Sequence, residues 1–150
     1  MCTWDGKFIG LAKNVAQWSK DRSHKVGCVI VNDKQSVLSI GYNGFPRGID
    51  DEVDSRHDRP DKYKWTEHSE RNAIYNAAYE GVSLKGGTAY VNFFPCTDCS
   101  RGMIQCGIKR VVAPKPDYDH HKYGEDFKVA LEMLTEANVE VSYTEDLEDC

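Results

Sequence analysis

Apolar residues recur every three or four positions in several stretches of the chain, the spacing typical of helices that bury one face. Near the N-terminus these residues are Phe8, Leu11, Ala12, Val15 and Trp18. We expect further helices from about Thr66 to Tyr79, from about Thr97 to Cys106, and around residues 127–134. Glycines follow two of these stretches at Gly81 and Gly107, where helices commonly end.

Shorter apolar and β-branched runs predict strands. Residues 25–32 and 36–43 form two such runs, and the polar residues 33–35 join them as in an antiparallel hairpin. Further strands are expected at residues 88–93, 110–113 and 139–143. Strands alternate with helices in the second half, which favours βαβ units and a sheet covered on both faces. We therefore predict an α/β protein, a three-layer α/β/α domain over residues 1–150 with a mixed sheet of about five strands.

Composition narrows the classes of partner. The formal net charge is −5. This negative charge argues against binding to a polynucleotide backbone, which requires clustered Lys and Arg. No apolar run approaches the roughly 20 residues of a membrane span, and the first residues show no signal-peptide pattern. We expect a cytoplasmic location without membrane or polynucleotide partners. The polar stretch 44–65 is long enough to be a functional or mobile loop.

Two segments carry candidate chemistry. His68 and Glu70 lie at the start of one expected helix, and Cys96 and Cys99 at the start of the next. One imidazole and two thiolates can hold Zn²⁺ and leave its fourth position for water, the arrangement of catalytic zinc sites. A helix N-terminus favours the thiolate form of cysteine. Glu70 is then placed to carry protons between water and a substrate.

Each segment alone is weak evidence, because H-x-E and C-x-x-C both occur by chance or for other reasons. A closed structural zinc site would need a fourth ligand. The candidates are Cys106, His57, His120 and His121. We interpret Cys106 as core packing and the two adjacent histidines as solvated surface.

Three further segments accompany H-x-E and P-C-x-x-C in a fixed order. They are residues 19–27 (SKDRSHKVG), residues 41–48 (GYNGFPRG) and residues 68–74 (HSERNAI). With these segments the chain resembles the cytidine deaminase superfamily, and more narrowly its deoxycytidylate (dCMP) deaminases. The resemblance extends from about Leu11 to Tyr143, and the compact size fits a phage or viral member.

The resemblance implies hydrolytic deamination of dCMP to dUMP and ammonia, which supplies dUMP for dTMP synthesis. His68, Cys96 and Cys99 would hold the catalytic Zn²⁺, with Glu70 as proton donor. Asn43 would bond the deoxyribose hydroxyl, the backbone of Ser69 would face the base, and Tyr118 would contact substrate.

The resemblance also implies a homohexamer that dCTP activates and dTTP inhibits, with Mg²⁺ on the triphosphate. Residues near the effector would be Asn43, Gly44, Phe45, Arg47 and Lys25. A substrate phosphate favours cationic partners, and we expect Lys20 and Arg22 to provide them. A solvated basic face is the alternative for each of these cations. A second, structural zinc is not expected, since residues 20–22 and 50–52 lack cysteine.

Two other functions stay open at this point. A deaminase of the same fold can edit flipped or single-stranded bases in tRNA or single-stranded DNA. The negative net charge of the chain argues against this function. A non-catalytic module stapled by zinc would use the same ligands with a fourth one, and it would not need Glu70.

Overall fold

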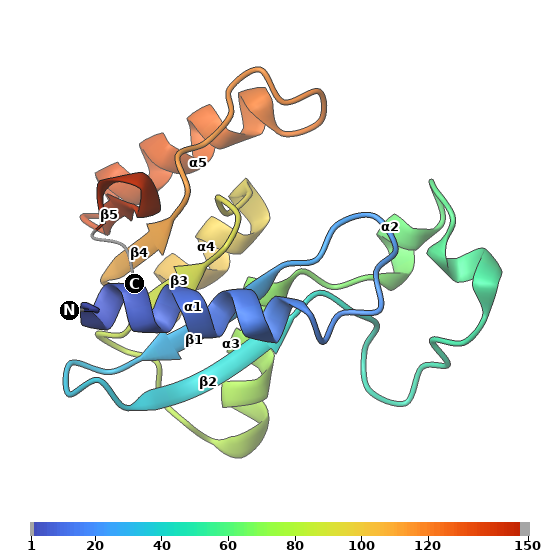
Figure 1. The fold of residues 1–150 in the computed structure, drawn as a ribbon, viewed down its shortest axis with the longest axis horizontal. Coiled ribbons are helices and arrows are strands. Elements are labelled where there is room, and N and C mark those ends of the chain that lie inside the picture. Colours follow the sequence, from blue (N-terminus) through green and yellow to red (C-terminus); the bar gives the residue numbers. More distant parts are fainter. Residues whose placement is uncertain (1, 148–150) are drawn as a thin grey trace.

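A computed structural model describes residues 2–147 and contains a five-stranded sheet between helices (Figure 1). The strands are β1 (Gly27–Val31), β2 (Val37–Tyr42), β3 (Thr88–Val91), β4 (Arg110–Ala113) and β5 (Glu140–Tyr143). Their order across the sheet is β2-β1-β3-β4-β5. Strand β1 pairs antiparallel with β2 and β3, whereas β3, β4 and β5 run parallel. The predicted mixed sheet and its opening hairpin are confirmed.

Helices cover both faces of this sheet. The helices are α1 (Trp4–Ala16), α2 (Lys62–Trp65), α3 (Ser69–Glu80), α4 (Thr97–Gln105) and α5 (Gly124–Glu136), with 3₁₀ turns at Asp54–His57 and Thr144–Asp146. Helix α1 packs on one face, and α3, α4 and α5 pack on the other (Figure 1). The three-layer α/β/α prediction is therefore confirmed. Within residues 2–147, no helix combines the length and apolar character needed to cross a bilayer.

Strand β1 lies in the middle of the core. All five of its residues are buried because helices cover it from both sides. Val29 and Val31 belong to the cluster under α1, whereas Cys28 and Ile30 belong to the cluster under α3, α4 and α5. The alternation of side chains along a strand thus divides β1 between two apolar layers.

The connections bring several functional segments to one edge of the sheet. Strand β3 ends at this edge and leads into α4, and β4 ends beside it and leads toward α5. Strand β1 runs antiparallel to β3, so its first residues lie at the same edge, where Cys28 pairs with Val91. The end of β2 is also here, since Tyr42 pairs with Gly27. In open α/β sheets, ligands bind outside the carboxyl ends of the strands.

Two sequence expectations about the segment before α3 were wrong. The stretch 44–65 is not only loop, because it holds a 3₁₀ turn and the four-residue helix α2. The helix expected from about Thr66 begins later, because the Thr66 N–H bonds to the Lys62 carbonyl and closes α2. Glu67 then pairs with Gly44 as an isolated bridge, so α3 begins only after His68.

Candidate active site

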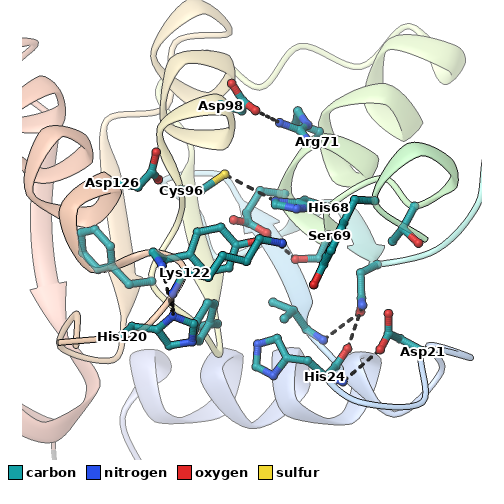
Figure 2. A pocket seen from close by; sticks show the side chains of 18 of the residues that line it. Asp21, His24, His68, Ser69, Arg71, Cys96, Asp98, His120, Lys122 and Asp126 are labelled. Carbon is teal, nitrogen blue, oxygen red and sulfur yellow. Dashed lines mark hydrogen bonds and ion pairs between the residues drawn. The ribbon is translucent and has the colours of Figure 1, made fainter. Parts of the chain in front are cut away.

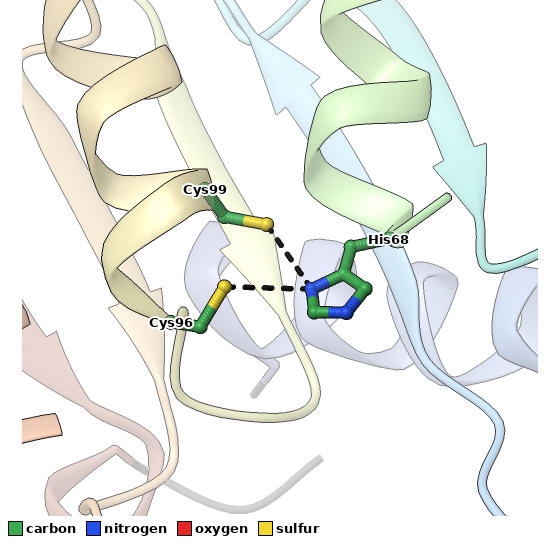
Figure 3. Close-up of side chains that lie close together, drawn as sticks. All are labelled: His68, Cys96 and Cys99. Atoms are coloured by element: carbon green, nitrogen blue, oxygen red, sulfur yellow. Dashed lines mark hydrogen bonds between the residues drawn. The ribbon is translucent and has the colours of Figure 1, made fainter. Parts of the chain in front are cut away.

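His68, Cys96 and Cys99 come together although they lie on different helices. His68 is the residue before the first turn of α3, and Cys96 holds the same position in α4. The His68 Nδ1 atom lies 3.4 Å from Cys96 Sγ and 3.5 Å from Cys99 Sγ (Figure 3). All ligand atoms of the three residues lie within 4.8 Å of one another. Two helix N-termini thus converge on one small volume, as the spacing of the motifs predicted.

The chemistry of this group suits Zn²⁺. A hydrogen bond from Cys99, together with His68, lowers the pKa of Cys96 to about 4, so one thiolate is present near neutral pH. The same hydrogen bond, together with burial, raises the pKa of Cys99. The hydrogen bond with Cys96 raises the pKa of His68 as well. Two sulfurs and one imidazole nitrogen make a typical three-residue zinc donor set.

The fourth-ligand candidates do not join this group. Within residues 2–147, no other His, Cys, Asp or Glu joins this group. Cys106 packs against the core, as predicted, and its thiol hydrogen-bonds to the Met103 carbonyl. His57 stacks on Phe45 and bonds through Nε2 to the Asp51 carbonyl. The described residues therefore form a three-residue group and not a closed four-residue site.

Glu70 lies in the first turn of α3, and its side chain is buried. The residue is 4% exposed, and it lines the same cavity as His68. Burial raises the pKa of its carboxyl group above the ordinary value. The Ser69 hydroxyl donates a hydrogen bond of 2.5 Å to Glu70 Oε1, which opposes that rise. The geometry puts a proton-carrying group beside the three-ligand group.

These residues lie in a cavity of about 470 Å³, within the range of small-molecule sites. His68, Ser69 and Cys96 line it (Figure 2). Glu70 lines it as well, and the rings of Phe93 and Tyr123 form part of its wall.

Asn43, expected at the deoxyribose, lines this cavity and is 7% exposed. Its Oδ1 accepts the Val26 N–H, and its Nδ2 donates to the His24 carbonyl. Tyr118 does not line the cavity and is 40% exposed. The chain turns back before α5, and Tyr123 reaches the cavity wall instead. The prediction that Tyr118 contacts substrate therefore lacks support from this structure.

Lys20 and Arg22 also lie outside the main cavity. Lys20 Nζ is 2.9 Å from carboxylate oxygens of both Asp51 and Glu52, and Arg22 is 2.6 Å from Asp54. The acidic run 50–54 folds back onto these two cations and pairs with them at the surface. Their expected contact with the substrate phosphate stays a prediction.

Residues expected near an effector are divided between two places. Asn43, Gly44 and Phe45 line a smaller cavity of about 90 Å³, which Lys20 also lines. Arg47 lies over the ring of Tyr79 and bonds to Asn76, so α3 holds it. Lys25 is exposed and lines neither cavity.

The structure adds cavity residues that the sequence interpretation missed. The cations lining the main cavity are Arg59, Lys62, Arg71 and Lys122. His120 and His121 line it as well; His121 is exposed, as expected for solvated surface, whereas His120 is half-buried. His120 Nδ1 accepts the backbone N–H groups of Lys122 and Tyr123, which fixes the turn before α5. Arg71 falls inside the segment 68–74, and the other positions lie outside the segments that carry the resemblance.

Comparison with known proteins agrees with this geometry. The model of the cytidine and deoxycytidylate deaminase zinc-binding region matches residues 2–115. An uncharacterized deaminase from the luxG 3′ region of Aliivibrio fischeri is 38% identical over 141 residues, which cover 93% of this chain and 92% of that protein. Human deoxycytidylate deaminase is 38% identical over 120 residues, covering 77% of this chain but 66% of the human enzyme.

A solved structure is also similar. The dCMP deaminase of cyanophage S-TIM5, in complex with dCMP and dUMP, superposes with a TM-score of 0.74 at 26% identity, covering 92% of this chain and 94% of that one. The matched region carries the zinc-binding description, and His68, Cys96 and Cys99 all fall inside it. The chain therefore belongs to the cytidine and deoxycytidylate deaminase family.

Proposed function

We propose that this protein catalyses the hydrolytic deamination of dCMP to dUMP and ammonia. One observation carries the proposal: the buried Glu70 carboxylate and the three-residue group His68, Cys96 and Cys99 line one cavity. A similar structure holds dCMP and dUMP, and similar human and animal proteins are named deoxycytidylate deaminases. A substrate of nucleotide size fits a cavity of about 470 Å³.

The residues divide the chemistry between them. Zn²⁺ held by His68, Cys96 and Cys99 would supply a Lewis acid that lowers the pKa of water toward about 7. Glu70 takes a proton from the attacking water and gives it to N3 of the cytosine ring, which makes C4 electrophilic. Oxygen adds to C4, Glu70 transfers a second proton to the amino group, and the C4–N4 bond breaks. Water and dCMP are thereby converted to dUMP and ammonia.

The cavity walls suit a pyrimidine nucleoside. Val26 and Phe93 provide apolar surface for a flat ring. The Asn43 amide uses one donor and one acceptor for the backbone, which leaves one N–H and one lone pair for a sugar hydroxyl. The Ser69 hydroxyl is engaged with Glu70, so contact with the base is expected from its backbone.

Regulation and assembly belong to the same proposal. We expect activation by dCTP and inhibition by dTTP with Mg²⁺, a homohexamer, one domain over residues 1–150, and a cytoplasmic supply of dUMP. The small cavity beside Gly44 and Phe45 supports an effector position, since Asn43 lines both cavities. Initial rates with each triphosphate, with and without Mg²⁺, together with light scattering, test these points.

Ammonia release tests the main reaction against its alternatives. Zinc-loaded protein should release ammonia from dCMP with saturation kinetics and leave single-stranded DNA and tRNA unchanged. Deamination of an oligonucleotide without deamination of dCMP would favour base editing. Stoichiometric zinc with no deamination of any of these substrates would favour a structural module.

A further inference from the structure

Lys62 is a buried cation that the deamination step does not use. Its side chain is 10% exposed, although lysine is almost never buried without a partner. The ammonium group lies 3.3 Å from both carboxylate oxygens of Asp21 and 2.7 Å from the Ser23 hydroxyl. These three contacts match the three donors of an ammonium group, but the two at 3.3 Å are longer than usual for a charge-assisted hydrogen bond, so a phosphate oxygen can take the place of one of them. Lys62 and Asp21 both line the main cavity.

Ser23 connects Lys62 with a second cation. Its hydroxyl accepts from Lys62 at 2.7 Å and from Arg59 Nη2 at 3.2 Å, and it donates to Asp21 at 3.1 Å. Asp21 also accepts the backbone N–H groups of Ser23 and His24, which fixes the turn that carries the hydroxyl. The hydroxyl therefore holds two cations beside each other at the cavity.

This cluster lies apart from the three-residue metal group. Figure 2 shows Asp21 and Cys96 on opposite sides of the view, with His68 nearer to Cys96. Lys122 lines the same cavity, with its ammonium group 3.4 Å from the centre of the Tyr63 ring. Three cations and one carboxylate make this part of the cavity cationic, in a chain of net charge −5. A local excess of positive charge with free donors fits a phosphate monoester.

We propose that Lys62 and Arg59, oriented by the Ser23 hydroxyl, bind the phosphate of the nucleotide substrate and so select dCMP over deoxycytidine. This inference rests on the proposed function and names the residues that set its substrate class. It differs from the expectation for Lys20 and Arg22, which lie outside the main cavity and pair with the acidic run 50–54.

Kinetics with two substrates test the assignment. Lys62→Met should raise the KM for dCMP by about 10- to 100-fold, the range expected for a lost charge-assisted hydrogen bond. The kcat/KM for deoxycytidine, which has no phosphate, should change less than about twofold. Lys62→Arg should restore part of the affinity for dCMP. Lys64→Met, an exposed position on the same helix, should match the wild type.

Lys62→Met leaves Asp21 without this ion pair, which can reduce folding. Arg59→Gln is therefore a second variant, because Arg59 is exposed and its replacement should not affect folding. It should raise the KM for dCMP and leave deoxycytidine unchanged. Equal losses for both substrates, or no change with dCMP in either variant, would overturn the assignment.

Calorimetry separates this inference from the proposed function. If the wild type released no ammonia from dCMP, the proposed function would fail. Titration of wild type, Lys62→Met and Arg59→Gln with dUMP and inorganic phosphate would still decide the phosphate site. Weaker binding of dUMP to both variants supports it. Unchanged binding of dUMP, or equal binding of deoxyuridine and dUMP by the wild type, contradicts it.

Discussion

The carboxylate of Asp126, in the first turn of α5, accepts two hydrogen bonds from Thr97, the first residue of α4. Its Oδ2 lies 2.9 Å from the Thr97 backbone nitrogen, and its Oδ1 lies 2.7 Å from the hydroxyl. Thr97 directly follows Cys96. One helix thus fixes the start of another, and with it the direction of a proposed zinc ligand.

Asp126→Ala should therefore weaken zinc binding. Loss of both hydrogen bonds frees the first turn of α4. Loss of a side chain that orients a metal ligand without binding the metal itself typically costs about 10- to 100-fold in metal affinity. Competition with a chelator measures the dissociation constant of zinc. Glu125→Gln is the matched control, because Glu125 is exposed and pairs only with Lys128 among the contacts described. Equal zinc affinity in both variants would contradict the role of Asp126.

Ser69→Ala should move the acid limb of the pH–rate profile to higher pH. The Ser69 hydroxyl lowers the pKa of Glu70, whereas burial raises it. Without the hydroxyl, the Glu70 pKa rises further. Since Glu70 must be ionised to accept a proton, activity is then lost at a higher pH as the solution is acidified. The measurement is kcat/KM for dCMP from pH 5 to 9, and an unmoved acid limb would show that the hydroxyl does not act on Glu70.

Gly41→Ala should destabilise the protein and disturb the site. A Cβ atom at Gly41 would lie 2.3 Å from the Ala73 nitrogen and 2.4 Å from the Ser69 carbonyl oxygen, so α3 would have to move away from β2. Overpacking of this kind costs about 1–3 kcal/mol, and the shift would displace His68 beside Ser69. Urea denaturation and zinc content report the two effects.

Gly10→Ala is the control for that substitution. A Cβ atom at Gly10, inside α1, meets no atom within 4 Å. Alanine should stabilise the helix by about 0.5–1 kcal/mol. Similar losses of stability in the two variants would contradict the close approach of α3 to Gly41.

Asp5→Asn should lower stability near neutral pH but not in acid. Asp5 accepts two hydrogen bonds from Arg110 and one from Tyr90, which joins α1 to β4 and β3. The hydrogen bond with Arg110 lowers the pKa of Asp5 below its ordinary value of 3.8. The contribution of these hydrogen bonds to the free energy of unfolding is therefore complete above pH 3.8. It is lost as the pH falls through the lower pKa that Asp5 has in the folded state.

The free energy of unfolding from urea titrations tests this sign. The difference between wild type and Asp5→Asn should be about 2 kcal/mol at pH 7, as for hydrogen bonds to charged groups. It should shrink below about pH 4. A difference that grows in acid would contradict the assignment.

Much of the architecture could be predicted because its signal is local. Apolar periodicity identifies α1 and α5, and the apolar, β-branched runs of the hairpin identify β1 and β2. The short helix α2 could not be predicted in this way. It has four residues in a polar stretch, and its stability depends on contacts such as Lys62 with Asp21, which are distant in sequence.

The same distinction applies to the site. His68, Cys96 and Cys99 each lie at or within one turn of a helix start, so short motifs predicted their convergence. Lys62 and Arg59 could not be found by motif, since only tertiary structure brings them to Ser23. The role of Lys20 and Arg22 at a substrate phosphate stays a prediction, and the sequence did not show that both cations pair with carboxylates of residues 51–54.

Replacement of Glu70 by glutamine tests the central claim most directly. Glutamine keeps the shape of the side chain but cannot carry the proton between water, the ring and the leaving amine. We predict that Glu70→Gln folds, binds one equivalent of zinc and releases ammonia from dCMP at least about 1,000-fold more slowly than the wild type, within the span of proton-transfer catalysis. A zinc-loaded Glu70→Gln variant with wild-type ammonia release would contradict the account.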